Sequence, residues 1–311
     1  MKVLISGTTG MVGSNVLEYL LKKTNWTFTC LCSWRHRGGE NLLQPNDRVE
    51  VVTHDITEPI PEIGNFDYIL NLASESHVDR SIAEPVNFIE NNVAIVLQML
   101  EYARKHPPKV FIQFSTDEVY GATYHKEWDI LLPSNPYAAS KACQEMIAIA
   151  YWKTFKVPLV ITNSNNIVGK NQNPEKFIPK IIDLIKNDKT VMIHTTKGKP
   201  GKRHYNPVEN IASALLFICD LTFLGFNPLT TRRNEDRPYR FSITGGKEMD
   251  NLEMAKLVAK LLNKTLVYEK VDVESIRPGY DEFYGKMMSS LEKFGWRPTT
   301  SLKKGLEWVK E

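Results

Sequence analysis

Two sets of side chains in the first half of this 311-residue chain could carry proton and hydride transfer. Thr116, Asp117 and Glu118 follow an apolar run and place a hydroxyl beside two adjacent carboxyls. Tyr137 and Lys141 come next, four residues apart. A tyrosine and a lysine suffice for redox chemistry. The two extra carboxyls therefore predict a second reaction, in which a proton is pulled off carbon and a hydroxyl leaves as water.

The Tyr–Lys pair is expected to act as a unit, because residues four apart lie on one face of a helix. The lysine charge is expected to lower the pKa of the Tyr137 phenol. Tyr137 can then take a proton from a substrate hydroxyl while hydride passes to a nicotinamide. Thr116, at the end of the preceding strand, can hold the same oxygen. A chance spacing is the alternative interpretation.

The carboxyl pair predicts how the work of elimination is divided. Oxidation of a sugar C4 hydroxyl acidifies the neighbouring C5–H, so that one carboxylate can abstract this proton while a protonated carboxyl assists departure of the C6 hydroxyl. Two close carboxyls repel each other, and the pKa of one should rise. Adjacent residues of a regular strand point to opposite faces. Asp117 and Glu118 can therefore both serve only if the strand has ended and the chain bends there; the alternative is a solvated acidic turn.

Short apolar runs alternate with amphipathic segments through the first 165 residues. The apolar runs are Lys2–Ser6, Thr27–Cys32, Val49–Thr53, Tyr68–Leu72, Val110–Ser115 and Leu159–Asn163. The amphipathic segments are Met11–Lys22, Phe88–Arg104 and Ala138–Phe155. This alternation is typical of βαβ units on a parallel sheet. We expect an α/β fold: a Rossmann-like doubly wound parallel sheet with a smaller, interleaved C-terminal substrate lid.

The pattern changes after Asn166, where turn-forming residues and lysines become frequent. Further on, we expect a helix from about 207 to 221, a strand over 239–244 and a helix from about 251 to 262. These features predict a dinucleotide-binding domain over residues 1–166, to which residues 203–245 partly return. Residues 167–202 and 246–311 are expected to form the substrate-binding lid.

A glycine-rich loop follows the first apolar run and opens the first helix. The residues expected to bind a dinucleotide here are Gly7, Thr9, Gly10, Met11, Val12 and Gly13. Gly7 permits a tight turn, Gly10 lets the backbone approach a pyrophosphate, and Gly13 lets the helix pack close to the sheet. Free N–H groups of the helix N-terminus then face the phosphates. The alternative is an ordinary strand–helix turn.

The end of the second apolar run should select the cofactor. An acidic residue there binds the ribose 2′-hydroxyl of NAD, whereas an arginine accommodates the 2′-phosphate of NADP. This chain has no acid there but presents Ser33, Arg35 and Arg37. We therefore expect NADP, with NAD as the alternative. Arg35 and Arg37 could instead be ordinary solvated loop charges with no ligand. Asp55 and Ile56, after the third run, are expected to flank the adenine, although Asp55 could equally cap a turn.

Composition narrows the classes of function and location. A net charge of +3 gives no case for nucleic acid as the main partner. No apolar run approaches the roughly 20 residues needed to span a bilayer, and the N-terminal run is too short for a signal peptide. The four cysteines match no usual zinc spacing, so buried thiols in a reducing compartment are expected. These features predict a soluble, cytoplasmic protein with no membrane partner and no metal.

The motifs resemble those of the extended short-chain dehydrogenase/reductase family, and most closely the nucleotide-sugar 4,6-dehydratases of the dTDP-glucose 4,6-dehydratase type. The resemblance runs nearly the whole length. It includes residues 71–81, Ser-Thr-Asp-Glu-Val-Tyr-Gly at 115–121, residues 135–142, 164–166, 174–179 and 244–246, Arg-Pro-Gly-Tyr-Asp at 277–281, and residues 294–298. The Thr-Asp-Glu trio separates these dehydratases from sister epimerases and decarboxylases.

The resemblance implies a role for each matching residue. Asp117 would be the acid, Glu118 the base, and Tyr137 with Lys141 the redox pair. Thr116 would hold the sugar of a UDP- or dTDP-hexose. Leu72 and Ala73 would contact the cofactor, and Ser76 the substrate. The residues implied at the diphosphate or nucleoside are Asn166, Lys176, Arg203 and Arg277. The three cations could instead be surface charges, and Asn166 could cap a turn.

Some positions depart from the family pattern. Arg203 is followed by His-Tyr where the family usually has Asp-Trp. Tyr280 replaces a histidine, and Glu282 and Phe283 replace two arginines that usually precede a tyrosine. These departures leave the nucleobase and the sugar open. The expected reaction gives a 4-keto-6-deoxy sugar. A nucleotide-sugar epimerase or another dehydratase on the same scaffold is the alternative, and a non-catalytic NADP-sensing regulator is a remote one.

A homodimer is also expected from the family. The segments 88–104 and 138–155 carry extra apolar and aromatic residues that could form a four-helix interface between two subunits. These residues are Met99, Tyr102, Ile147, Tyr151 and Trp152. The alternative is that they pack inside one subunit.

Overall fold

A seven-stranded sheet forms the larger part of the computed structural model, which describes residues 1–33, 46–230, 236–244, 247–272, 282–285 and 289–310. The strand order is β11-β6-β5-β4-β1-β2-β3, and every pairing is parallel. The strands are β1 (Lys2–Ser6), β2 (Thr27–Cys32), β3 (Val49–Thr53), β4 (Tyr68–Asn71), β5 (Val110–Thr116), β6 (Leu159–Ser164) and β11 (Tyr239–Ile243). The predicted α/β doubly wound fold is confirmed, and the predicted apolar runs are these strands to within one residue.

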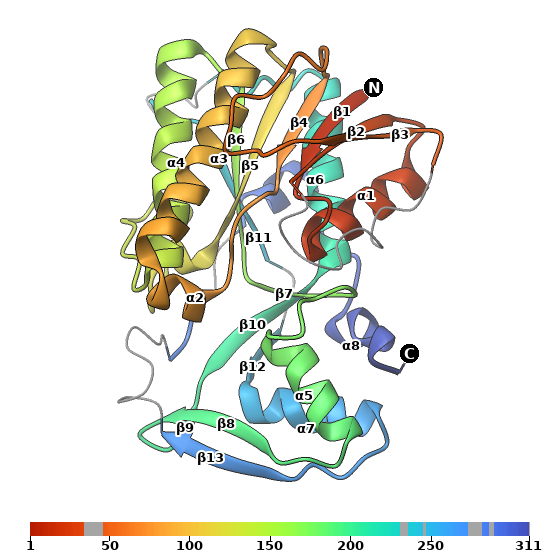
Figure 1. The fold of residues 1–311 in the computed structure, drawn as a ribbon, viewed down its shortest axis with the longest axis vertical. Coiled ribbons are helices and arrows are strands. Elements are labelled where there is room, and N and C mark those ends of the chain that lie inside the picture. The colour runs from red at the N-terminus through yellow and green to blue at the C-terminus, as the bar shows by residue number, and fades with distance from the viewer. Residues whose placement is uncertain (34–45, 231–235, 245–246, 273–281, 286–288, 311) are drawn as a thin grey trace.

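Helices cover both faces of this sheet (Figure 1). The two on one face are α1 (Met11–Lys23) and α6 (Val208–Phe223), and those on the other are α2 (Val78–Ala83), α3 (Pro85–Lys105) and α4 (Pro136–Phe155). Side chains of β1 alternate between the two cores: Val3 and Ile5 pack with α1 and α6, and Leu4 packs with α3 and α4. This alternation follows from the strand geometry and explains why both faces of each strand are apolar.

The start of α4 is defined by its own sequence. The Asn135 side chain accepts a hydrogen bond of 2.9 Å from the backbone N–H of Ala138, and Pro136 occupies the first helical position. Both features favour helix initiation. They fix Tyr137 in the first turn of α4, with Lys141 one turn further on.

A second group of elements lies at the carboxyl ends of the main strands (Figure 1). One three-stranded sheet contains β7 (Asn166–Val168), β10 (Lys202–Pro207) and β12 (Lys247–Asp250), and another contains β8 (Val191–Thr196), β9 (Lys199–Pro200) and β13 (Tyr268–Asp272). The helices are α5 (Phe177–Lys186), α7 (Asn251–Leu261) and α8 (Leu302–Gly305). Short 3₁₀ turns are η2 (Asp117–Tyr120), η3 (Leu291–Phe294) and η4 (Glu307–Lys310). The assignment of residues 167–202 and 246–311 to a substrate-binding lid stays a prediction.

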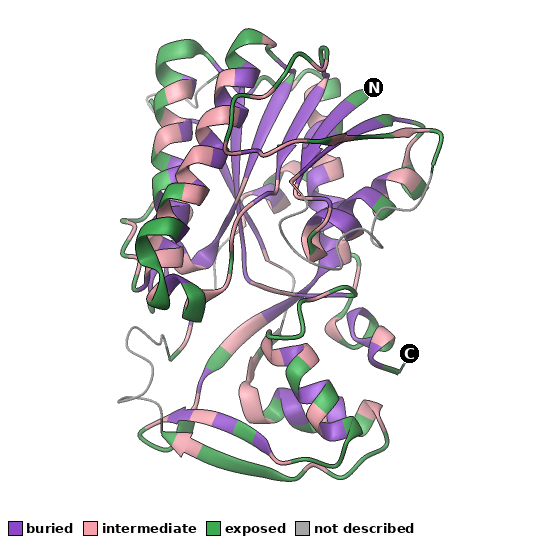
Figure 2. Cartoon of the chain, in the orientation of Figure 1, coloured by how far each residue is buried: buried purple, intermediate pink, exposed green. Residues whose placement is uncertain are grey.

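The burial of α3 and α4 corrects the residues expected at a subunit interface. Met99, Tyr102 and Trp152 are at most 5% exposed and pack in the core beside the main sheet. Both helices are buried toward the sheet and more exposed on the opposite side (Figure 2). The exposed large apolar side chains of these two helices are Val86, Met146 and Phe155. The helical periodicity was right, but it did not show which side of each helix faces the sheet.

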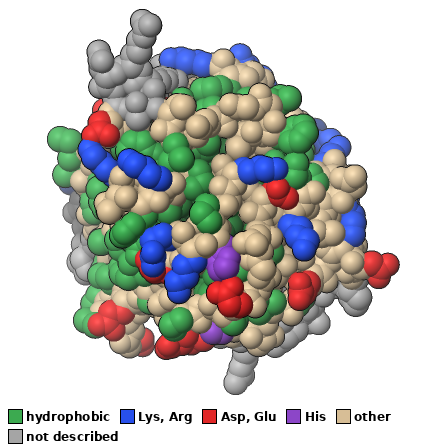
Figure 3. Space-filling model, turned by 90° about the horizontal axis from the view of Figure 1, so that it is seen from above, with side chains coloured by type: hydrophobic (Ala, Val, Ile, Leu, Met, Phe, Trp, Pro, Cys, Tyr) green, Lys and Arg blue, Asp and Glu red, His purple; other side chains and the backbone are tan. Residues whose placement is uncertain are grey.

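The described residues contain no helix long and apolar enough to cross a membrane. On the face shown in Figure 3, lysine and arginine side chains are scattered among acidic and hydrophobic ones and form no basic stripe within the part of the chain that is described.

Candidate active site

A single cavity of about 870 Å³ lies at the carboxyl ends of the main strands and extends toward α5 and β8. It brings together the predicted residues Gly7, Thr9, Gly10, Met11, Val12, Gly13, Ser33, Asp55, Ile56, Leu72, Ala73, Ser76, Thr116, Glu118, Tyr137, Lys141, Asn166, Lys176 and Arg203. Asp117 is buried beside the cavity and does not line it. Arg35, Arg37 and Arg277 lie outside the described residues.

The loop between β1 and α1 depends on two glycines for its close packing against the protein's own backbone. Gly7 has a φ of +79°, and a Cβ there would lie 2.8 Å from the backbone nitrogen of Ala73. A Cβ on Gly13 would lie 2.1 Å from the Gly7 carbonyl oxygen, so only glycine lets α1 pack this tightly. The helix begins after Gly10 with no acidic residue in its first turn. Its free N–H groups and dipole therefore suit a phosphate group at this end of the cavity.

The loops after β2 and β3 form the neighbouring wall. Cys32 and Ser33 line the cavity, and the Cys32 thiol contacts the Thr8 hydroxyl at 3.2 Å. Asp55 lines the cavity and also caps a turn, because its carboxylate accepts hydrogen bonds from the backbone and the hydroxyl of Thr57 at 3.0 and 2.7 Å. The two interpretations of Asp55 are therefore compatible. No acidic side chain follows β2 up to Ser33, where the described residues stop.

The chain turns where β5 ends. Thr116 is the last residue of β5, and η2 begins at Asp117. The Thr116 hydroxyl accepts the backbone N–H of Glu118 at 3.3 Å, and the Asn163 side chain donates to the Thr116 carbonyl at 3.0 Å. The condition for a joint role of the two carboxyls, that the strand ends before them, is met. Glu118 faces the cavity, whereas Asp117 is 1% exposed just beneath it.

Asp117 is held in a dry environment. Its carboxyl accepts hydrogen bonds from the Asn165 amide at 2.8 Å and from the Thr116 hydroxyl at 3.3 Å. Burial, reinforced by the neighbouring charge of Glu118, raises the pKa of Asp117 to about 7, against the lowering effects of Asn165 and Arg203. The carboxyl therefore keeps a proton close to neutral pH, as expected for one member of a close pair.

Tyr137 and Lys141 both line the cavity, but the predicted lowering of the tyrosine pKa is wrong. Burial and the negative charge of Glu118 raise the pKa of Tyr137, and contact with Thr116 only partly offsets this. The Lys141 amine donates to the Phe114 carbonyl at 2.8 Å and to the Gln144 side chain at 2.6 Å. Burial lowers the pKa of Lys141 to about 7. Burial, Glu118 and Thr116, rather than Lys141, are the main influences on the pKa of Tyr137.

Tyr284 is a cavity residue that sequence reasoning missed. Its hydroxyl donates to the Glu118 carboxylate at 3.1 Å, and its ring lies 4.7 Å from the guanidinium of Arg203. The side chain is 5% exposed and lines the cavity. The available signal was the tyrosine that follows the two replaced arginines in the family pattern.

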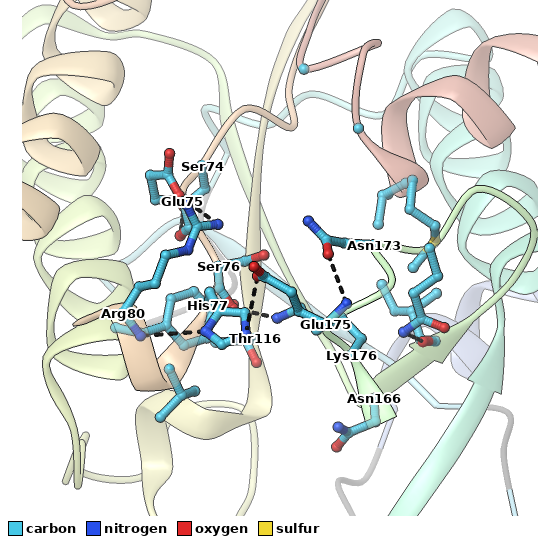
Figure 4. Close-up of a pocket in the computed structure, with 18 of the residues that line it drawn as sticks. Ser74, Glu75, Ser76, His77, Arg80, Thr116, Asn166, Asn173, Glu175 and Lys176 are labelled. Carbon is cyan, nitrogen blue, oxygen red and sulfur yellow. Dashed lines mark hydrogen bonds and ion pairs between the residues drawn. The ribbon is translucent and has the colours of Figure 1, made fainter. Parts of the chain in front are cut away.

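The loop after β4 meets the segment before α5 across the cavity (Figure 4). The Lys176 amine donates to the Ser76 carbonyl at 2.6 Å, and the His77 ring lies 3.4 Å from the Glu175 carboxylate. Burial, together with the charge of Lys176, lowers the pKa of His77. Lys176 and Arg203 place two cations on the side of the cavity away from the glycine loop, near Asn166. Charge-assisted contacts from such cations suit a diphosphate.

Comparison with known proteins gives consistent matches. The model of the NAD dependent epimerase/dehydratase family matches residues 3–225. A dTDP-D-glucose 4,6-dehydratase from Dictyostelium discoideum is 31% identical over 98% of this chain and 80% of its own length. The structure of a dTDP-glucose 4,6-dehydratase from Streptomyces venezuelae with NAD bound has a TM-score of 0.86 and 27% identity, covering 100% of this chain and 96% of that chain.

An epimerase has the same fold. The structure of a UDP-glucuronic acid 4-epimerase from Bacillus cereus has a TM-score of 0.86 but only 21% identity, covering 100% of this chain and 99% of that chain. Overall shape therefore does not separate the two reactions, and the residues of the site must do so.

The raised pKa of Asp117 predicts how stability depends on pH. Between about pH 4 and 7 the folded chain holds a proton that the unfolded chain has released, so this group lowers stability progressively as the pH rises. Replacing Asp117 with Asn should remove that cost. We compare the free energy of unfolding of Asp117→Asn with that of the native protein at each pH. This difference should favour the variant more at pH 8 than at pH 4.5, by on the order of 2 kcal/mol.

Urea denaturation at the two pH values measures this difference. The exposed Asp183→Asn on α5 is the matched control and should change the free energy by less than about 0.5 kcal/mol. An equal effect of Asp117→Asn at both pH values would contradict the assignment of a protonated carboxyl.

Proposed function

This chain belongs to the NAD dependent epimerase/dehydratase family and is an enzyme of that family, and on that premise we propose that it is a nucleotide-sugar 4,6-dehydratase. The observation that carries the proposal is the turn at the end of β5. It places the Glu118 carboxylate and the Thr116 hydroxyl in one cavity with Tyr137, and it sets a buried carboxyl with a pKa near 7, that of Asp117, directly beside that cavity. An epimerisation at C4 has no need of such a pair, whereas removal of water needs both a base and an acid.

The site fits a nicotinamide dinucleotide, because Gly7 and Gly13 let the loop and α1 pack tightly, and the N-terminus of α1 at the cavity wall offers free N–H groups to a phosphate. When bound, the nicotinamide would accept a hydride from C4 of the sugar and return it to C6. Tyr137, with Thr116 beside it, would take the proton of the C4 hydroxyl, which requires that the positive charge of a bound nicotinamide offset the rise in the Tyr137 pKa caused by burial and Glu118. Lys141 lies one turn along α4 on the same cavity wall and contributes positive charge.

The two carboxyls divide the elimination between them. Glu118 faces the cavity and is oriented by the Tyr284 hydroxyl, which suits the removal of the C5 proton. Asp117 holds a proton near neutral pH, which suits protonation of the leaving C6 oxygen. The Thr116 hydroxyl contacts Asp117 at 3.3 Å and also lines the cavity, so it connects the buried acid to the substrate space.

The substrate is proposed to be a UDP- or dTDP-hexose. Lys176 and Arg203 would hold the diphosphate, with Asn166 beside them. Arg277 keeps the same proposed role but lies outside the described residues. Apolar side chains continue the cavity beyond the cations, and these are Phe177, Ile178, Ile181, Leu184, Val191 and Met192. An apolar recess next to a cationic one matches the base and the diphosphate of a nucleotide.

Two alternatives give different observable products. A 4-epimerase, or a dehydratase acting across another bond, would use the same scaffold, and proton NMR of the product distinguishes both from a 4-keto-6-deoxy sugar. A non-catalytic regulator would sense the cofactor without turnover. The concentration of Thr116, Glu118, Tyr137 and Lys141 in one cavity argues for catalysis. We also propose a cytoplasmic location, since the four cysteines are free thiols.

Substitution of each carboxyl should interrupt a different step. In deuterated water, Glu118→Gln should abolish solvent deuterium entry at C5, because the base is lost. Asp117→Asn should slow the elimination of water by about a hundredfold, because the acid that protonates the leaving oxygen is lost. Reduced cofactor should still accumulate transiently, because hydride transfer comes before that step. Rapid absorbance measurements and mass spectrometry of the sugar follow these two events.

The exposed Glu307→Gln, outside the cavity, is the control and should behave as the native protein does. Undiminished C5 exchange in Glu118→Gln would refute its role as base. Normal turnover of Asp117→Asn would refute the acid.

The form of the nicotinamide cofactor is a separate proposal. Relatives of known structure contain NAD, which favours NAD, whereas Ser33, Arg35 and Arg37 without a neighbouring acid favour NADP. We expect NADP to bind about tenfold more tightly than NAD, from one charge-assisted contact to the 2′-phosphate. The double substitution Arg35→Ala, Arg37→Ala should remove that preference and leave NAD affinity unchanged. Fluorescence titration with each cofactor measures both effects.

Arg104→Ala, in the last turn of α3, serves as the control for general loss of positive charge. Equal affinities in the native protein would defeat the preference for NADP, and tighter binding of NAD would assign NAD as the cofactor.

A homodimer is the remaining proposal. Val86 of α3 and Met146 of α4 are exposed apolar side chains, and α3 and α4 of two subunits could form a four-helix interface. Light scattering should give twice the chain mass, and Met146→Asp should give a monomer. A monomeric native protein would overturn the proposal.

A further inference from the structure

The amine of Lys141 rests on a layer of polar side chains beneath the cavity. Its closest partner is the side-chain oxygen of Gln144, at 2.6 Å, with the Phe114 carbonyl at 2.8 Å. Gln144 lies one helical turn after Lys141 on α4 and is fully buried, with none of its surface exposed. It does not line the cavity, so its contact with substrate or cofactor can only be indirect.

The orientation of the Gln144 amide is determined by its neighbours. Its oxygen accepts from the Gln113 amide at 3.2 Å as well as from Lys141, and its nitrogen donates to the Asn92 carbonyl at 2.7 Å. A flipped amide would place its NH₂ group against two other donors and its oxygen against the carbonyl. Only the observed orientation satisfies all three partners, which is the arrangement expected of a buried amide.

The same line of hydrogen bonds continues under the cavity to the loop after β4. The Gln113 oxygen accepts from the Asn71 amide at 2.8 Å, and the Asn71 oxygen accepts from the Ser6 hydroxyl at 2.7 Å. The Ser6 oxygen in turn accepts the backbone N–H groups of Leu72 and Ala73, both at 3.1 Å. Every side chain in this line is buried. It links β1, β4, β5 and α4 and ends at two residues that line the cavity.

We propose that Gln144 is a positioning residue for Lys141: its side-chain oxygen sets where the lysine amine lies on the cavity floor. The hydrogen-bonded side chains of Gln113, Asn71 and Ser6 connect Gln144, and through it the position of the lysine amine, to the backbone of residues 72 and 73. The catalytic use of the lysine rests on the proposed function, but its position and protonation do not.

The charges around Lys141 define what a change at Gln144 should do. Glu145, on the same helix and paired with Arg240 of β11, raises the pKa of Lys141. Asn92 of α3 and Gln113 of β5 present neutral amides, and Asp117, Glu118 and Tyr137 are the titratable groups at the adjoining end of the cavity. Without an acceptor at position 144 the buried ammonium is disfavoured, whereas a carboxylate there favours it. The two substitutions should therefore act in opposite directions.

Nuclear magnetic resonance of the lysine side-chain ammonium groups tests this in the protein without added cofactor or substrate. The Lys141 signal is assigned by its loss in Lys141→Arg. We expect the protonation midpoint of Lys141 to fall by about one pH unit in Gln144→Met, which keeps the side-chain length but removes the acceptor. It should rise by at least about one unit in Gln144→Glu. Thr154→Ala, exposed near the end of α4, is the control and should leave the midpoint unchanged.

Shifts in the same direction for both variants, or no shift, would overturn the proposal. If Gln144→Met fails to fold, Gln113→Met can replace it, because Gln113 is the next residue in the hydrogen-bonded line. Gln113→Met should lower the protonation midpoint of Lys141 by a smaller amount. An unchanged midpoint in that variant would also overturn the proposal. When a nucleotide sugar is added, transient cofactor reduction can be measured as a function of pH. The alkaline side of that pH profile should shift in each variant in the same direction as the protonation midpoint of Lys141. Opposite midpoint shifts without any cofactor reduction would support the positioning role and defeat the proposed function.

Discussion

The end of β5 at Thr116 is the constraint on which the site depends. Had the strand continued, Asp117 and Glu118 would face opposite sides of the sheet. The Thr116 hydroxyl caps η2, and the Asn163 side chain holds the Thr116 carbonyl and also donates to Glu145. Glu145 is paired with Arg240, and both are buried. A turn of four residues is thus supported by β6, α4 and β11, which is why two consecutive carboxyls can act at one place.

Burial brings the ionisable groups of this turn and of α4 into a common range. A carboxyl becomes harder to ionise when water is excluded, and an amine becomes harder to protonate. Asp117 and Lys141 therefore both have a pKa near 7, although their ordinary values lie far apart. Proton exchange between such groups and a substrate costs little near neutral pH, which suits a reaction that moves protons in several steps.

The features that could be predicted from the sequence are those encoded locally. The strands were visible as apolar runs, and the glycine loop was visible because its spacing follows a strand and opens a helix. Tyr284 was missed because it reaches Glu118 across 166 residues of chain, and no local pattern reports such a contact. The partner of the Lys141 amine was missed for a related reason. Gln144 looks like any polar helix residue until α3 and β5 are seen to bury it.

The contacts of Lys176 with Ser76 and of Glu175 with His77 join the two sides of the cavity. A ligand whose phosphate oxygens displace the Ser76 carbonyl from the Lys176 amine must break this contact. The observed dissociation constant of such a ligand equals the constant for the separated state divided by the fraction of molecules in which this contact is already broken. Weakening this contact would therefore tighten the binding of any such ligand without altering an atom that the ligand touches.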